Sequence, residues 1–137
     1  MHRMLGIFLF FAVILFAGCA SKITRYGYGL QDMPDKYKNF GCDIVIKKDF
    51  VYNKDEVDIL GEIKAGDSGL SFDCGKKYVL SLFKKEACAL SADLINITYE
   101  RNIDLWSSCY RAKAQFLRFK DKEKVKNLES DAAYIDT

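Results

Sequence analysis

The chain has 137 residues, which is enough for one domain with a modest hydrophobic core but not for two. Its 21 basic residues nearly balance its 19 acidic ones, and this argues against a nucleic-acid partner, which would need a clustered basic face. The only histidine is His2, so the rest of the chain has no imidazole for acid–base catalysis or for a zinc site.

Residues 1–20 have the pattern of a secretory leader. A short basic start is followed by an uncharged stretch, whose apolar core over 5–17 is shorter than the roughly 20 residues that a membrane span needs. This core ends in the letters LFAGC (15–19), which resemble the lipobox of bacterial lipoproteins, except that Phe16 stands where the family usually has an aliphatic residue. The alternative is an ordinary secretory leader with a chance cysteine.

The lipobox resemblance implies that residues 1–18 are a signal peptide, cleaved before Cys19, and that the thiol of Cys19 carries lipid. Several acyl chains hold a protein to a membrane far more firmly than one, so the expected anchoring is permanent. Because Ala20 rather than Asp follows, the same resemblance implies export to the outer membrane, facing the periplasm, in a host with two membranes. The mature protein would keep 119 of the 137 residues.

Residues 19–41, which begin at the lipidated N-terminus, are expected to form a tether. They mix glycine, tyrosine and charged residues without a period and contain the only proline, Pro34. Their aromatic residues leave two interpretations: they pack back onto the domain, or they lie on lipid headgroups or on a partner. These residues are Tyr26, Tyr28, Tyr37 and Phe40.

Residues 42–119 are expected to form the folded domain, because four stretches in them alternate apolar and polar residues as half-buried strands do. The first contains Ile44 and Ile46, the second covers 57–64, the third begins at Leu94, and the fourth covers 110–116. The charge-rich residues 120–137 are expected to form a frayed helix or a solvated tail.

A helix is predicted over 75–90, between the second and third strands, because its apolar residues recur with a period of 3.6. Cys88 falls on the outer side of this helix. The core side holds Val79, Leu82, Phe83, Ala87 and Leu90. The order strand, strand, helix, strand, strand predicts a single small α+β domain with one face of the sheet covered by the helix.

Four cysteines remain besides Cys19, and an even number in an exported domain predicts two disulfides. A short turn makes the helix antiparallel to the third strand, so Cys74 at the helix start lies at the edge where Cys109 begins the last strand. Cys74 and Cys88 would lie about 21 Å apart along the helix, beyond the reach of a bridge. Cys88 is therefore expected to pair with Cys42, which requires the first strand to run parallel to the third.

A four-thiolate metal site is the competing interpretation of these cysteines. No two of them have the CxxC spacing that lets one tight turn supply two ligands. No metal and no other cofactor is therefore expected.

With this strand order, the segments LGEI (60–63), KKEACALSADLINI (84–97) and CYR (109–111) resemble the C-terminal domain of the stress-sensor lipoproteins of the RcsF family. In that family a cysteine before the helix pairs with one in a Cys-Tyr-Arg segment, and Cys74 and Cys109 occupy those places. The chain departs from the family in two respects: no cysteine follows Cys109, and its tether has a single proline. The resemblance implies a sensor or protein-binding function in the envelope.

The residues favour binding over catalysis. No carboxylate pair stands in a recognisable catalytic motif, and the CxxC of a thiol oxidoreductase is missing. The expected function is therefore that of a non-enzymatic envelope lipoprotein with another envelope protein as its partner. The alternatives are a structural or surface-antigen lipoprotein without a specific ligand, and a small-ligand or metal-binding envelope protein.

The loop 101–108, with the start of the last strand, is the candidate partner-binding surface. Trp106 and Arg111 lie there beside the expected disulfide at Cys109, and tryptophan and arginine are common anchors of protein interfaces. The alternative is that Trp106 closes one end of the core, as a tryptophan in a small domain often does.

Overall fold

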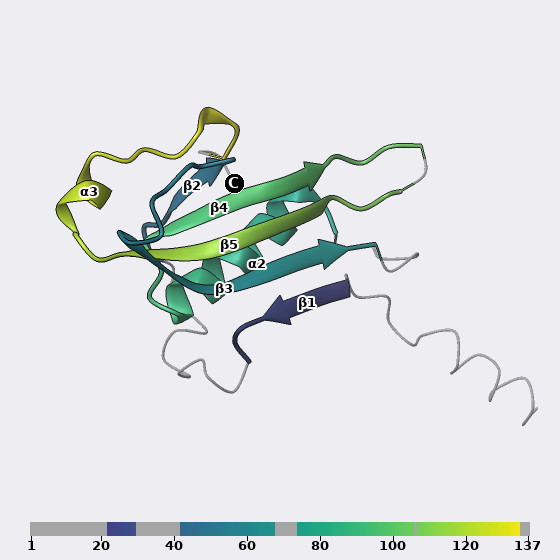
Figure 1. Ribbon diagram of the computed structural model, residues 1–137. Coiled ribbons are helices and arrows are strands. Elements are labelled where there is room, and N and C mark those ends of the chain that lie inside the picture. Colours follow the sequence, from purple (N-terminus) through teal and green to yellow (C-terminus); the bar gives the residue numbers. More distant parts are fainter. Residues whose placement is uncertain (1–21, 30–41, 68–73, 106, 135–137) are drawn as a thin grey trace, which may run out of the picture.

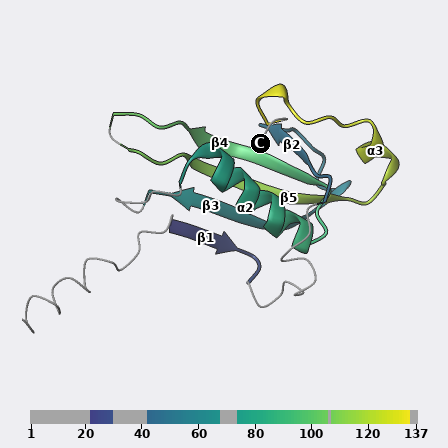
Figure 2. The ribbon, with the colours of Figure 1, turned by 180° about the vertical axis from the view of Figure 1, so that it is seen from behind.

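The computed structural model describes residues 22–29, 42–67, 74–105 and 107–134, and a mixed sheet of five strands runs through it (Figure 1). The helix α2, Lys76–Ala89, lies across one face of this sheet, as the view from behind shows (Figure 2). The strands are β1 Lys22–Tyr26, β2 Val45–Lys48, β3 Val57–Gly66, β4 Leu94–Arg101 and β5 Arg111–Phe119. Their order across the sheet is β1-β3-β5-β4-β2. The predicted α+β class is confirmed.

Both predicted disulfides are present. Cys74 and Cys109 are bonded with a Cα–Cα distance of 4.9 Å, and Cys42 and Cys88 with one of 5.8 Å. The second bridge required the first predicted strand to run parallel to the third, and β2 does pair in parallel with β4. Cys88 lies outside the main core, as its predicted place on the outer side of the helix requires, and it is only 5% exposed because the chain at Cys42 covers it.

The expectation of a tether over 19–41 is wrong for Lys22–Tyr26, which form the edge strand β1 antiparallel to β3. This strand is held from the helix side: the guanidinium of Arg25 and the hydroxyl of Tyr28 both donate hydrogen bonds to the carboxylate of Glu86 on α2. The ring of Tyr28 also packs on Phe116, with ring centroids 5.8 Å apart. Of the two interpretations of the aromatic residues, Tyr28 follows the first, and Tyr37 and Phe40 lie outside the described residues.

The main core lies between α2 and the sheet. It is closed on the helix side by Val79, Leu80, Phe83 and Ala87, all of which are fully buried. Facing them from the strands are Ile46, Ile63, Ala65, Ile95, Ile97, Ala112, Ala114 and Phe116. The predicted core positions Leu82 and Leu90 are only half-buried, whereas Leu80 is fully buried.

A second, smaller core lies on the opposite face of the sheet, and β3 and β4 each change faces part-way along. The pairing register shifts between Ile59 and Gly61 in β3 and between Ile97 and Tyr99 in β4. Such bulges turn the residues that follow to the other side, so the strict alternation predicted for 57–64 is wrong and Ile59 is exposed. The buried residues of the second core are Val57, Leu94, Leu117 and Phe119, with Phe50, Tyr52, Val125 and Leu128 packed against them.

The C-terminal segment is more than a solvated tail. Its charged residues surround the short helix α3, Glu123–Lys126, and are exposed as expected. Beyond them the backbone N–H of Asp131 donates to the carbonyl of Ile46 at 2.9 Å, and the carboxylate of Asp131 accepts the N–H of Lys48 at 2.8 Å. Tyr134, in the 3-10 turn Ala132–Tyr134, is 2% exposed and completes the main core.

A methyl group at Gly61 should detach β1. A Cβ atom there would overlap the ring of Tyr28 and lie 3.0 Å from the carbonyl oxygen of Tyr26. We expect Gly61→Ala to lower the free energy of unfolding by about 1–3 kcal/mol, because overpacking displaces Tyr28 from Glu86. Chemical denaturation measures this change. Gly66→Ala in the same strand is the matched control, since a Cβ atom there would meet only the carbonyl oxygen of Lys22, at an ordinary contact distance of 3.7 Å. Equal stability of the two variants would contradict the prediction.

Candidate binding surface at the hairpin end of the sheet

The loop predicted to bind a partner forms the tip of the hairpin between β4 and β5. Arg101 at the end of β4 pairs with Arg111 at the start of β5. Two apolar side chains of the tip point into solvent: Ile103 is 59% exposed and Leu105 is 100% exposed. Burial of such exposed apolar side chains against a partner contributes favourably to binding.

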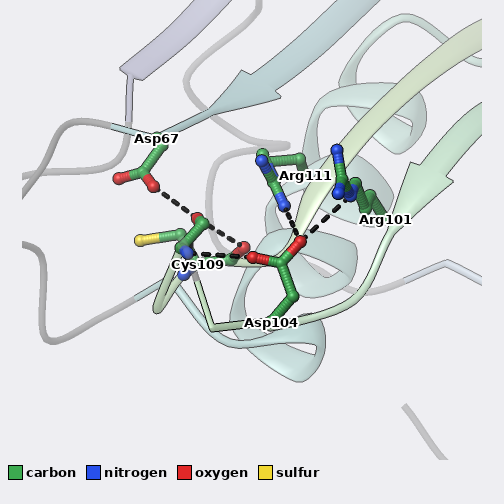
Figure 3. A network of polar contacts seen from close by, with 6 residues as sticks. Asp67, Arg101, Asp104, Cys109 and Arg111 are labelled. Atoms are coloured by element: carbon green, nitrogen blue, oxygen red, sulfur yellow. Dashed lines mark hydrogen bonds and ion pairs between the residues drawn. The ribbon is translucent and has the colours of Figure 1, made fainter.

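The carboxylate of Asp104 organises this tip (Figure 3). Its Oδ2 atom accepts from Nη2 of Arg111 at 2.7 Å and lies 3.0 Å from Nε of Arg101. Its Oδ1 atom accepts the backbone N–H of Ser107 at 2.9 Å. One side chain therefore links the ends of both strands to the turn between them.

Ser107 connects the tip to the end of β3. Its hydroxyl is buried and donates to the carboxylate of Asp67, which directly follows β3. The same oxygen accepts the backbone N–H of Cys109 at 3.3 Å. The tip is thus hydrogen-bonded to the residue that follows β3, as well as to residues of its own hairpin.

The base of the hairpin is fixed by the Cys74–Cys109 disulfide and by Tyr110. The backbone N–H of Tyr110 donates to the carbonyl of Cys74 at 2.9 Å, and its hydroxyl donates to Glu100 at 2.7 Å. Burial raises the pKa of the Glu100 carboxyl, but hydrogen bonds from Tyr110 and Lys48 outweigh this effect and lower it overall. Burial and the neighbouring Glu100 raise the pKa of Tyr110 well above its usual value. Glu100 stays ionised and Tyr110 protonated at neutral pH.

A hollow of about 790 Å³ opens beside the hairpin on the face of the sheet that α2 does not cover. It spans four strands, from β1 at one edge through β3 and β5 to β4. Its lining includes four basic residues, Lys22, Lys64, Arg111 and Lys113, and one acidic residue, Asp67. Two half-exposed aromatic side chains, Tyr26 and Tyr99, also line it.

The structure places Arg111, one of the two predicted partner-binding residues, between the hairpin and the hollow. Its Nη2 atom is engaged by Asp104, and its Nε atom is buried without an acceptor among the residues that the structure describes. Trp106, the other predicted anchor, and Cys19, the predicted lipid site, lie outside the described residues. Sequence reasoning missed the organising role of Asp104, although aspartate is a common turn residue because its side chain can accept hydrogen bonds from nearby backbone N–H groups.

Neither a metal site nor a membrane span is found in the described part of the chain. No group of three or more His, Cys, Asp or Glu side chains within 22–29, 42–67, 74–105 and 107–134 could hold a metal ion. Over these ranges no helix is both long and apolar enough to cross a membrane.

The chain was compared with protein-family models, with curated proteins and with solved structures, and no match was found. The resemblance to the RcsF family therefore stays a prediction that rests on the quoted segments.

The role of Asp104 can be tested by amide exchange. Asp104→Ala removes the shorter of the two acceptors of the Ser107 amide, leaving the backbone carbonyl of residue 104 at 3.3 Å, and it removes both arginine contacts. We therefore expect the Ser107 amide to exchange roughly tenfold faster. Asp121→Ala is the control, since the carboxylate of Asp121 accepts the backbone N–H of Glu123 but lies in the C-terminal segment, away from the tip. If the Ser107 amide exchanges at its original rate in Asp104→Ala, the carboxylate does not hold the tip.

Proposed function

We propose that this chain is a lipoprotein of the bacterial cell envelope, anchored through Cys19, whose domain binds a protein partner and carries out no chemistry of its own. The leader with its LFAGC end supports the anchor. Two disulfides are typical of exported domains of this size, and they occupy all four cysteines of the described domain. Without a free thiol there, and with no histidine after His2, the domain offers no obvious nucleophile and base.

The observation that carries the binding proposal is the stiff, apolar tip of the hairpin. Ile103 and Leu105 project from a turn that Asp104, Ser107 and a disulfide hold in one conformation. A loop that is already ordered loses little entropy when it binds, so more of the interaction energy appears as affinity. The partner class supported best is another envelope protein, in the manner of a sensor or an adaptor.

Partner binding can be tested by crosslinking in native membranes. We expect the double variant Ile103→Ser/Leu105→Ser to capture at least about tenfold less partner, because truncation of central anchors typically has this effect. Val51→Ser is the matched control, since Val51 is 91% exposed in the loop between β2 and β3. Equal capture by both variants would show that the tip is not the binding site and would favour a structural lipoprotein or surface antigen.

Trp106→Ala in the same assay separates the two interpretations of that residue. Loss of capture with an unchanged unfolding midpoint makes Trp106 an interface anchor. A lowered midpoint makes it part of the core, and the binding energy must then come from Ile103, Leu105 and Arg111.

The anchor is tested separately by Cys19→Ser. We expect this variant to lose incorporation of radiolabelled palmitate and to lose cleavage after Gly18, because the thiol is the site of the lipid. Mass spectrometry of the N-terminal peptide measures both. Wild-type protein without lipid on Cys19 would contradict the lipoprotein proposal and leave the hairpin proposal standing.

A further inference from the structure

The hollow beside the hairpin is a basic surface built from alternate residues of the strands. In β1, Ile23 packs toward the main core and Arg25 bonds to Glu86, so Lys22, Thr24 and Tyr26 face the other side. Lys64 of β3 stands opposite both Thr24 and Lys113 in the strand pairing. Three lysines from three strands therefore share one open face.

These lysines are available for an anion. Lys22, Lys64 and Lys113 are exposed, and none forms an ion pair with any residue in the described part of the chain. The one acidic residue of the lining, Asp67, is engaged by Ser107. Glu62, farther along the same face, accepts from Gln115 at 2.7 Å. The hollow thus keeps a net positive charge, with three lysines against the one carboxylate of its lining, and the hydroxyl-bearing rings of Tyr26 and Tyr99 flank them.

The start of β1 fixes how far this surface lies from the predicted lipid. Lys22 is the third residue after Cys19, so even a fully extended chain separates their Cα atoms by at most about 10 Å. A long tether would let any face of the domain meet the membrane. With β1 in the sheet, the end of the domain that bears Lys22, the hairpin and the hollow is held next to the bilayer.

We propose that the basic hollow, lined by Lys22, Lys64, Arg111 and Lys113, binds the phosphate headgroups of anionic phospholipids in the membrane that holds the chain; this inference rests on the proposed lipid at Cys19. Lysines near an anionic bilayer are attracted to it, and tyrosines favour the headgroup region. The docked domain turns α2 away from the bilayer. A partner bound at the hairpin tip then lies in or on the same membrane.

Lysine footprinting of the full chain tests this surface. The protein is purified from bacterial membranes and placed in vesicles of phosphatidylcholine alone or of phosphatidylcholine and phosphatidylglycerol in equal parts. Acetylation by a water-soluble reagent is then followed by peptide mass spectrometry. We expect Lys22, Lys64 and Lys113 to react at least about fivefold more slowly in the anionic vesicles, and the protection to fall as salt is added. Lys77 and Lys85, exposed on α2, should react equally in both.

A charge-reversed pair supplies the matched comparison. Lys64→Glu/Lys113→Glu should abolish the protection of Lys22, whereas Lys77→Glu/Lys85→Glu, with the same change in net charge on the helix, should keep it. Equal reactivity of the three lysines in both vesicles overturns the inference. Protection in native membranes but not in lipid vesicles also overturns it, and identifies an acidic protein as the occupant. The mass of the N-terminal peptide, read from the same sample, reports separately whether Cys19 carries lipid.

Discussion

The buried carboxylate of Glu86 holds the first strand on the domain, and the position of both proposed binding surfaces depends on it. Glu86 is 3% exposed and accepts hydrogen bonds from Arg25 and Tyr28. A charge at this depth is unfavourable without partners, and removal of one partner of a buried pair typically costs about 3–5 kcal/mol. The bond to Glu86 raises the pKa of Arg25, while burial and Glu86 raise the pKa of Tyr28, so both donors keep their protons. Both side chains therefore remain hydrogen-bond donors to Glu86 at physiological pH.

The two faces of the sheet explain why the open surface lies at the hairpin end. One face is covered along its length by α2. On the other face, the loop after β2 and the C-terminal segment cover only the part near Val57, Leu94 and Phe119. The bulges in β3 and β4 separate this covered part from the polar part, where Lys64 and Lys113 stand. The second core thus stabilises one end of the sheet and leaves this face uncovered at the hairpin end.

The sequence predicts the parts of this fold that depend on local pattern. Alternation located β2 to β5, the 3.6-residue period located α2, and chain direction with bridge length selected Cys74–Cys109 and Cys42–Cys88. β1 was not predicted because one of its two inward residues is Arg25, which alternation counts as polar, beside the apolar Ile23. The partner of Arg25, Glu86, lies 61 residues away. Tyr134 was not predicted as a core residue for a similar reason, since it follows a charged stretch and is placed in the core by the bonds of Ser130 and Asp131 to β2, which are distant in sequence. The hollow is lined partly by β1, and because the sequence did not predict β1, it could not predict the hollow either.

The two disulfides constrain how such a domain can respond to a partner. Cys74 ties the chain just before α2 to the start of β5, and Cys88 ties the last turn of α2 to the chain just before β2. The helix is therefore fastened to the sheet at both ends, and each bridge contributes roughly 3 to 4 kcal/mol through the unfolded chain. With β1 held by Glu86, α2 and the five described strands are tied into one unit. Under the proposed function, a domain tied in this way responds by moving as one body, so the response lies in the position of the hairpin end relative to the membrane and the partner.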